Sequence, residues 1–122
     1  MPNSPLMRLL VMGTLALAGC GPGPASAPVR LVESRRAGRA ILAVVPLGQV
    51  RINARVPPAI ELRGGSVIRL PRGRISGDSS YFLDPPWQVR PAMPVIHGNL
   101  RVSYCRADEA LCRSVVLPVR LP

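Results

Sequence analysis

The 122-residue chain contains no lysine, one histidine and only four aromatic residues. A single histidine leaves little material for a metal centre or a Ser-His-carboxylate triad, and no glycine-rich phosphate loop follows an extended run. No window shows a helical apolar period bounded by capping residues. The sequence therefore favours neither a helical fold nor a serine hydrolase or nucleotide-binding enzyme.

Arginine alone carries the basic charge, and the formal net charge is +10 at pH 7. If Arg8 leaves with a signal peptide, 15 basic residues remain against 6 acidic ones, a balance of 15 − 6 = +9. Such a charge favours anionic surfaces such as phospholipid head groups or lipopolysaccharide, although biased genomic composition also explains a lysine-free chain. The arginines do not alternate with aromatic residues, so we expect no nucleic-acid partner.

The first twenty residues read as an export signal. Arg8 precedes an apolar run at residues 9–18, and a run of ~10 residues is too short to span a bilayer. The run ends in Leu17-Ala18-Gly19-Cys20, which resembles the bacterial lipobox. That resemblance implies a signal peptide over residues 1–19, cleavage before Cys20 and lipidation of Cys20. The alternative is an ordinary secretory signal that happens to end in cysteine.

A short tether separates the lipidation site from the folded part. Residues 20–28 comprise Cys20 and the segment GPGPASAP, which has no apolar periodicity and is typical of a linker. The folded domain is expected over residues 29–122. Gly21 does not resemble the acidic retention signal of the inner membrane. We expect a lipid-anchored protein of the cell envelope that faces the periplasm or the cell exterior.

The remaining chain consists of short extended runs with turn residues about every ten positions. We expect a strand from Val29, a charged turn at residues 34–39, a central strand covered on both faces at 40–45, and a half-exposed strand at 50–56. Further extended pieces follow at 60–62 and 67–70, whereas residues 72–93 read mainly as turns. This pattern predicts a small all-β sandwich.

Residues 99–122 predict a closing hairpin. Its apolar residues alternate, which puts Leu100, Val102 and Tyr104 on one face of the first strand and Val115, Leu117, Val119 and Leu121 on one face of the second. If both faces cover one core, Cys105 and Cys112 project from the same outer face. Opposed residues can lie about 4.5 Å apart, so we predict a disulfide between them that is open to solvent.

The cysteine pair permits two roles. With Cys20 lipidated, an even pair remains, as expected in an oxidising compartment. As a structural bond, the pair closes a loop of about eight residues and raises the free energy of unfolding by roughly 2.5 kcal/mol. As a redox centre it needs an accessible sulfur and a stabilised thiolate, which Arg106 and Arg113 favour and Asp108 and Glu109 oppose.

Two stretches resemble a known family. The first is residues 45–53, VPLGQVRIN, running on to Pro57 and Leu62. The second is the cysteine hairpin from Tyr104-Cys105 through Cys112 to residues 117–119, LPV. Both are similar to immunoglobulin-like domains related to the N-terminal domain of DsbD-type thiol-disulfide reductases. The hairpin also resembles the terminal β-domain of thioredoxin-like proteins with NHL-repeat propellers. The resemblance implies an immunoglobulin-like sandwich.

In the reductase family the hairpin cysteines pass electrons from a membrane partner to periplasmic oxidoreductases, and the matching positions are Cys105 and Cys112. An aromatic-bearing loop shields those cysteines, and Tyr81-Phe82 are candidates for that part. The pair here is slightly further apart, with six intervening residues, and the transmembrane reductase and thioredoxin domains are missing. In the propeller-linked relatives the hairpin is expected to be structural only.

Two functions follow. The first is a lipid-anchored binding or scaffold module of the cell envelope, in which Cys105 and Cys112 form a structural disulfide and no enzyme activity is expected. The alternative is a thiol-disulfide interchange relay with periplasmic thioredoxin-like partners, in which the same two residues are the redox pair. No cofactor or metal is expected, because His97 and the two cysteines are one ligand short of tetrahedral zinc. The sequence does not indicate an oligomeric state.

Overall fold

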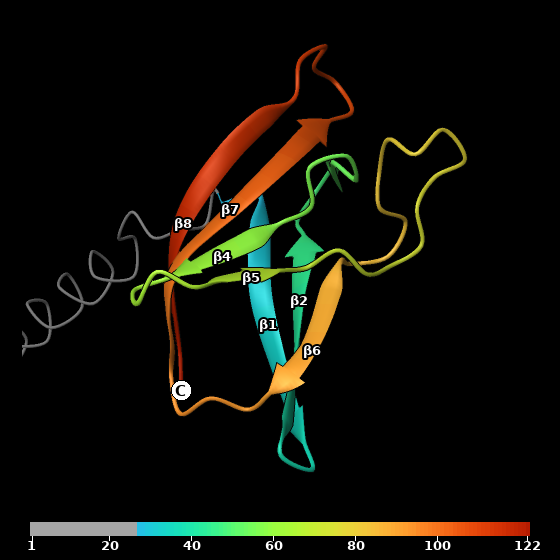
Figure 1. Cartoon of the computed structure of the whole chain (residues 1–122). Coiled ribbons are helices and arrows are strands. Elements are labelled where there is room, and N and C mark those ends of the chain that lie inside the picture. The colour runs from blue at the N-terminus through green and yellow to red at the C-terminus, as the bar shows by residue number, and fades with distance from the viewer. Residues whose placement is uncertain (1–26) are drawn as a thin grey trace, which may run out of the picture.

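The computed structural model describes residues 27–122 (Figure 1). The predicted signal peptide, Cys20 and most of the tether lie outside the described residues. Within the described part, no helix is long and apolar enough to cross a membrane. The strands of this part are β1 (Val29–Arg36), β2 (Arg39–Pro46), β3 (Val50–Ile52), β4 (Ala59–Leu62), β5 (Val67–Arg69), β6 (Trp87–Pro91), β7 (Ile96–Arg106) and β8 (Arg113–Leu121).

The strands form two antiparallel sheets that pack against each other (Figure 1). The three-stranded sheet has the order β1-β2-β6, and the five-stranded sheet has β7 at its centre. One edge of β7 pairs with β8, while the other edge pairs first with β4 and then with β3; β5 pairs with the far edge of β4. The prediction of a small all-β sandwich is confirmed.

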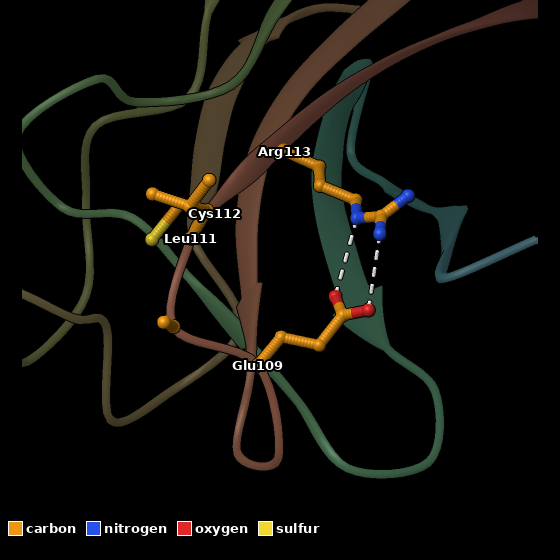
Figure 2. A pocket seen from close by; sticks show the side chains of 5 residues that line it. Glu109, Leu111, Cys112 and Arg113 are labelled. Atoms are coloured by element: carbon orange, nitrogen blue, oxygen red, sulfur yellow. Dashed lines mark hydrogen bonds and ion pairs between the residues drawn. The ribbon is translucent and has the colours of Figure 1, made fainter.

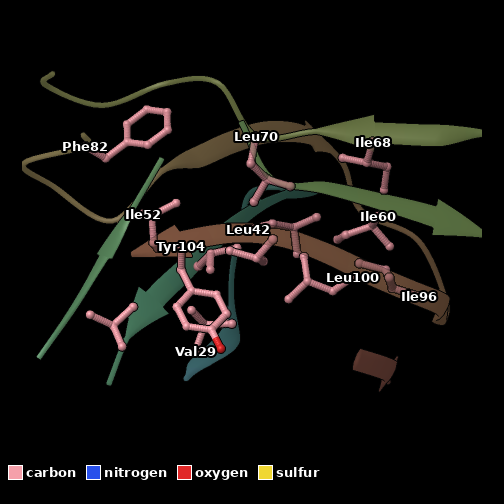
Figure 3. Close-up of a cluster of buried hydrophobic side chains, with 13 residues drawn as sticks. Val29, Leu42, Ile52, Ile60, Ile68, Leu70, Phe82, Ile96, Leu100 and Tyr104 are labelled. Atoms are coloured by element: carbon pink, nitrogen blue, oxygen red, sulfur yellow. The ribbon is translucent and has the colours of Figure 1, made fainter. Parts of the chain in front are cut away.

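The core lies between the sheets and is built from alternate residues of the inner strands (Figure 3). Leu42 and Val44 enter it from β2, and Ile60 and Leu100 enter it from β4 and β7, all with 0% exposed surface. Phe82, from the long segment before β6, lies at one end of the cluster (Figure 3). Each fully buried aliphatic side chain contributes about 1.5–3 kcal/mol.

The alternation predicted for the closing hairpin is confirmed. In β7 the residues Leu100, Val102 and Tyr104 are buried, and in β8 the residues packed against the core are Val115, Leu117, Val119 and Leu121. The β7–β8 register runs without a break from Ile96↔Leu121 to Tyr104↔Arg113. Because side chains alternate between faces along a strand, this register determines whether each side chain of the hairpin points to the core or to the outer face of the sheet.

The charged turn expected at residues 34–39 is much shorter. β1 continues to Arg36 and β2 begins at Arg39, so the connection consists of Ala37 and Gly38, with φ of 53° and 76°. A two-residue hairpin of this kind needs positive φ at both central positions. Alanine rarely adopts that conformation, and for this reason the sequence indicated the turn but not that it is only two residues long.

Two further strand predictions were wrong. β2 is central in its sheet, but Ile41 on its outer face is 40% exposed, so the strand is covered on one face only. β3 ends at Ile52 instead of residue 56 because Asn53 Oδ1 accepts a hydrogen bond from the Arg55 amide at 2.8 Å, which turns the chain. The segment 72–93 also contains a regular strand, β6, that the turn-rich sequence did not suggest.

We predict that Gly98→Ala destabilises the sandwich. Gly98 lies in β7 opposite Leu62 of β4, and a Cβ atom there would overlap the main-chain carbonyl of Glu61. A strand must shift to accommodate it, so the free energy of unfolding in urea should fall by about 1–3 kcal/mol. The control is Gly64→Ala, where a Cβ meets nothing within 4 Å and a change within about 0.5 kcal/mol is expected. Equal effects of the two substitutions would contradict the packing described for β7.

Candidate functional site

The β7–β8 register brings Cys105 and Cys112 together. Cys105 follows Tyr104 and Cys112 precedes Arg113, and Tyr104 and Arg113 are opposite each other in the register. The two cysteines form a disulfide with their Cα atoms 4.2 Å apart. This separation is typical of a non-hydrogen-bonded antiparallel pair. The predicted pairing of Cys105 with Cys112 is therefore confirmed, and the bond closes the hairpin tip, which we define as residues 106–112 with the disulfide at its base.

The two cysteines differ in exposure. Cys112 is exposed, whereas Cys105 is 6% exposed although it projects from the outer face of the five-stranded sheet. Tyr81 forms an isolated β-bridge with Asn53, and the Ser80 carbonyl accepts a hydrogen bond from the Ala54 amide at 2.8 Å. These contacts place a loop beside the disulfide, and a hollow of about 140 Å³ between them is lined by Asn53, Arg55, Ser80, Tyr81, Cys105 and Cys112. The disulfide, which we predicted to be open to solvent, is thus accessible to solvent only on the side of Cys112.

Residues 76–81, which we call the cover loop, are held by their own side chains. Ser76 Oγ donates to Asp78 Oδ1 at 2.7 Å and accepts from the Tyr81 amide at 3.1 Å. Asp78 Oδ1 also accepts from the Ser80 amide at 3.1 Å. The hydrogen bonds from Ser76 and then from Ser80 hold the pKa of Asp78 below its ordinary value. The carboxylate therefore stays ionised and keeps the loop closed on itself beside the disulfide.

Two arginines, Arg51 and Arg55, lie on the covered side of the disulfide. Arg51 lies opposite Cys105 in the β3–β7 register, with its guanidinium 5.3 Å from the centroid of the Tyr81 ring. Arg55 lines the hollow, whereas Arg106 lies on the other face of β7, with its guanidinium 5.6 Å from the centroid of the Tyr104 ring. Among residues 27–122 neither Arg51 nor Arg55 forms an ion pair. After reduction, this positive charge would favour a Cys105 thiolate over the thiol.

The hairpin tip presents an apolar side chain to solvent. Leu111 is 79% exposed, and a shallow, open hollow of about 510 Å³ extends over residues 109–113 (Figure 2). Beside it, both oxygens of Glu109 accept hydrogen bonds from the Arg113 guanidinium, at 3.2 and 3.1 Å. Leu111 could not be identified as a candidate from the sequence, because a lone leucine in a polar loop has no periodic partner.

His97 lies far from the cysteines, at the opposite end of β7 from Cys105. Its Nδ1 is 3.0 Å from the guanidinium of Arg120. Desolvation, and then the charges of Arg120 and Arg63, hold the pKa of His97 below its ordinary value. The described residues contain no group of three or more side chains suited to a metal ion.

The three aromatic residues of the segment 72–93 lie in different parts of the fold. These residues are Tyr81, Phe82 and Trp87. Only Phe82 is buried in the core. Tyr81 lies beside the disulfide, and Trp87 lies in β6 with Arg72 5.3 Å from its ring centroid.

The fold and the site define a small all-β sandwich closed by a hairpin disulfide. No protein family, curated protein or solved structure matches this chain. The relation to DsbD-type domains therefore stays a prediction that rests on the sequence resemblance.

Proposed function

We propose that the chain is a lipid-anchored binding module of the cell envelope that engages its partner through the hairpin tip. The observation that carries this proposal is the 79% exposed Leu111 on a loop closed by a disulfide. Large apolar side chains at fixed, exposed positions are typical of interfaces, where they become buried on binding. The lipobox at residues 17–20 and the tether up to residue 28 support the anchored location.

The tip is ordered before any partner arrives. Its base is fixed by the Cys105–Cys112 bond, and its return strand is fixed by the ion pair between Glu109 and Arg113 at 3.1 Å. The Glu109 amide also donates to the Arg106 carbonyl at 3.2 Å, which forms a turn. A pre-ordered loop loses less conformational entropy on binding than a flexible one, so more of the contact energy appears as affinity.

The strand order supports an immunoglobulin-like arrangement. With β1, β2 and β6 taken as strands A, B and E, and β5, β4, β7 and β8 as C′, C, F and G, the two sheets have the order A-B-E and C′-C-F-G. β3, which pairs with β7 on the same edge as β4, has no letter in this assignment. Immunoglobulin domains use the orders A-B-E-D and C-F-G, with C′ added in variable domains. The tip then corresponds to the F–G loop, one of the loops that variable domains use for binding.

We predict that a photoreactive amino acid in place of Ala110 forms one defined cross-linked product in intact cells. Adding Leu111→Ser should reduce its yield about tenfold or more, because a buried leucine contributes about 1.5–3 kcal/mol. Gel mobility and mass spectrometry provide the measurement. The matched control is Leu83→Ser, which removes a leucine that is 59% exposed on a different loop and should leave the yield unchanged. No product at position 110, or equal loss with both serine variants, would contradict binding through the tip.

A second candidate, thiol-disulfide exchange, is favoured by the different exposure of the two cysteines. A thiolate of a thioredoxin-like partner attacks Sγ of the exposed Cys112, which forms a mixed disulfide and releases Cys105 as a thiolate. The second thiolate of the partner then displaces Cys112, so that two electrons pass to the pair and the partner is oxidised to a disulfide. Arg51 and Arg55 would stabilise the released thiolate, and Tyr81, which lines the hollow beside the disulfide, is a candidate for the aromatic shield that the family resemblance implies.

The reduction potential separates the two functions. For a structural bond in a binding module we expect a value below about −300 mV, measured by thiol alkylation after equilibration in dithiothreitol buffers. A value between about −270 and −180 mV, the range of thioredoxin and protein disulfide isomerase, would contradict the structural role and support exchange.

A further inference from the structure

The outer face of the three-stranded sheet is apolar at its centre. The inner face holds Leu42 and Val44, so alternation assigns the neighbouring positions to the outer face. The β1–β2 and β2–β6 registers place these outer residues side by side in two rows, Val32↔Ala43↔Trp87 and Ser34↔Ile41↔Val89. Ile41 is 40% exposed, and Val32, Ala43, Trp87 and Val89 are partly exposed. We call these five apolar residues the sheet stripe.

Within residues 27–122, arginines border the sheet stripe and no carboxylate does. Arg36 and Arg39 are opposite each other at one end, Arg30 lies near the start of β1, and Arg72 stacks on Trp87 at 5.3 Å. None of these four arginines forms an ion pair within the described part of the chain. The one acidic residue of β1, Glu33, lies on the inner side of the strand and pairs with Arg35 at 3.2 Å.

We propose that the sheet stripe and its arginines dock flat on the anionic phospholipid surface of the membrane that holds the chain. Tryptophan is favoured at the bilayer interface, where its ring is apolar and its N–H meets water. Arginines near the surface add attraction to anionic head groups. One sheet face thus provides both the apolar surface and the positive charge that favour binding at a membrane interface.

The proposal rests on the lipid anchor proposed above. Six residues lie between Cys20 and Ala27, where the described chain begins, and the seven Cα–Cα steps from Cys20 to Ala27 span at most about 25 Å. The three-stranded sheet starts two residues later at Val29, within reach of the bilayer. A second copy of the chain is a poor occupant, because stacking two such faces would bring their arginines together without a carboxylate between them.

Trp87 is the only tryptophan and reports directly on docking. The chain, purified with its lipid, is reconstituted in vesicles of phosphatidylcholine alone or of equal parts phosphatidylcholine and phosphatidylglycerol, each with brominated acyl chains. We expect a blue shift and quenching of Trp87 emission only in the mixed vesicles, and their loss in 1 M salt, where the Debye length is about 3 Å. Identical emission in the two kinds of vesicle would overturn the proposal.

Charge-reversal variants locate the surface. The double variant Arg36→Glu, Arg39→Glu should lose the quenching in mixed vesicles. The control Arg63→Glu, Arg69→Glu changes the net charge equally on the β4–β5 hairpin of the other sheet and should retain it. Equal loss in both would show attraction by net charge alone and would overturn docking through this face. The salt titration of the unchanged protein keeps the test valid if a variant fails to fold.

The anchor is tested separately on the same material. Intact mass spectrometry should show a chain that begins at Cys20 and carries acyl groups. A chain that retains residues 1–19 would contradict the anchor, whereas unchanged Trp87 emission in a correctly lipidated chain would contradict docking alone.

Discussion

The antiparallel register of β7 and β8 is the constraint on which the rest of the structure depends. β7 is the only described strand with three partners, since it pairs with β8 on one edge and with β4 and β3 on the other. With the observed register, Leu100 and Val102 face the core and Cys105 meets Cys112. A slip of one residue would reverse the faces of β8, expose its apolar residues and part the two sulfurs.

The features that we connect with function follow from this register. The disulfide closes a tip that carries Leu111, and β3 and the cover loop lie against the covered side of Cys105. The tip extends from the five-stranded sheet, whereas the sheet stripe lies on the three-stranded sheet, on the face away from the core. The two proposed contact surfaces therefore lie on different sheets, and docking at one would leave the other accessible.

The sequence predicted the parts of the fold that depend on local alternation. Two alternating apolar runs with a cysteine at each inner end sufficed to predict the closing hairpin, its faces and its bond. The cover over Cys105 could not be predicted from local alternation, because it depends on a main-chain hydrogen bond between Ala54 and Ser80, far apart in sequence. Only the family resemblance indicated an aromatic shield at Tyr81-Phe82, and of these two residues Tyr81 lines the hollow beside the disulfide. The exposed face of β2 was missed because a continuous apolar run does not distinguish a strand covered on one face from a strand covered on both.

The most direct test compares the free energy of unfolding in urea of the oxidised protein and of the double variant Cys105→Ser, Cys112→Ser. If the disulfide holds the hairpin that organises the sandwich, we expect a loss of roughly 2.5 kcal/mol for a loop of this length. An unchanged free energy of unfolding would contradict that claim, because the hairpin would then keep its register without the bond.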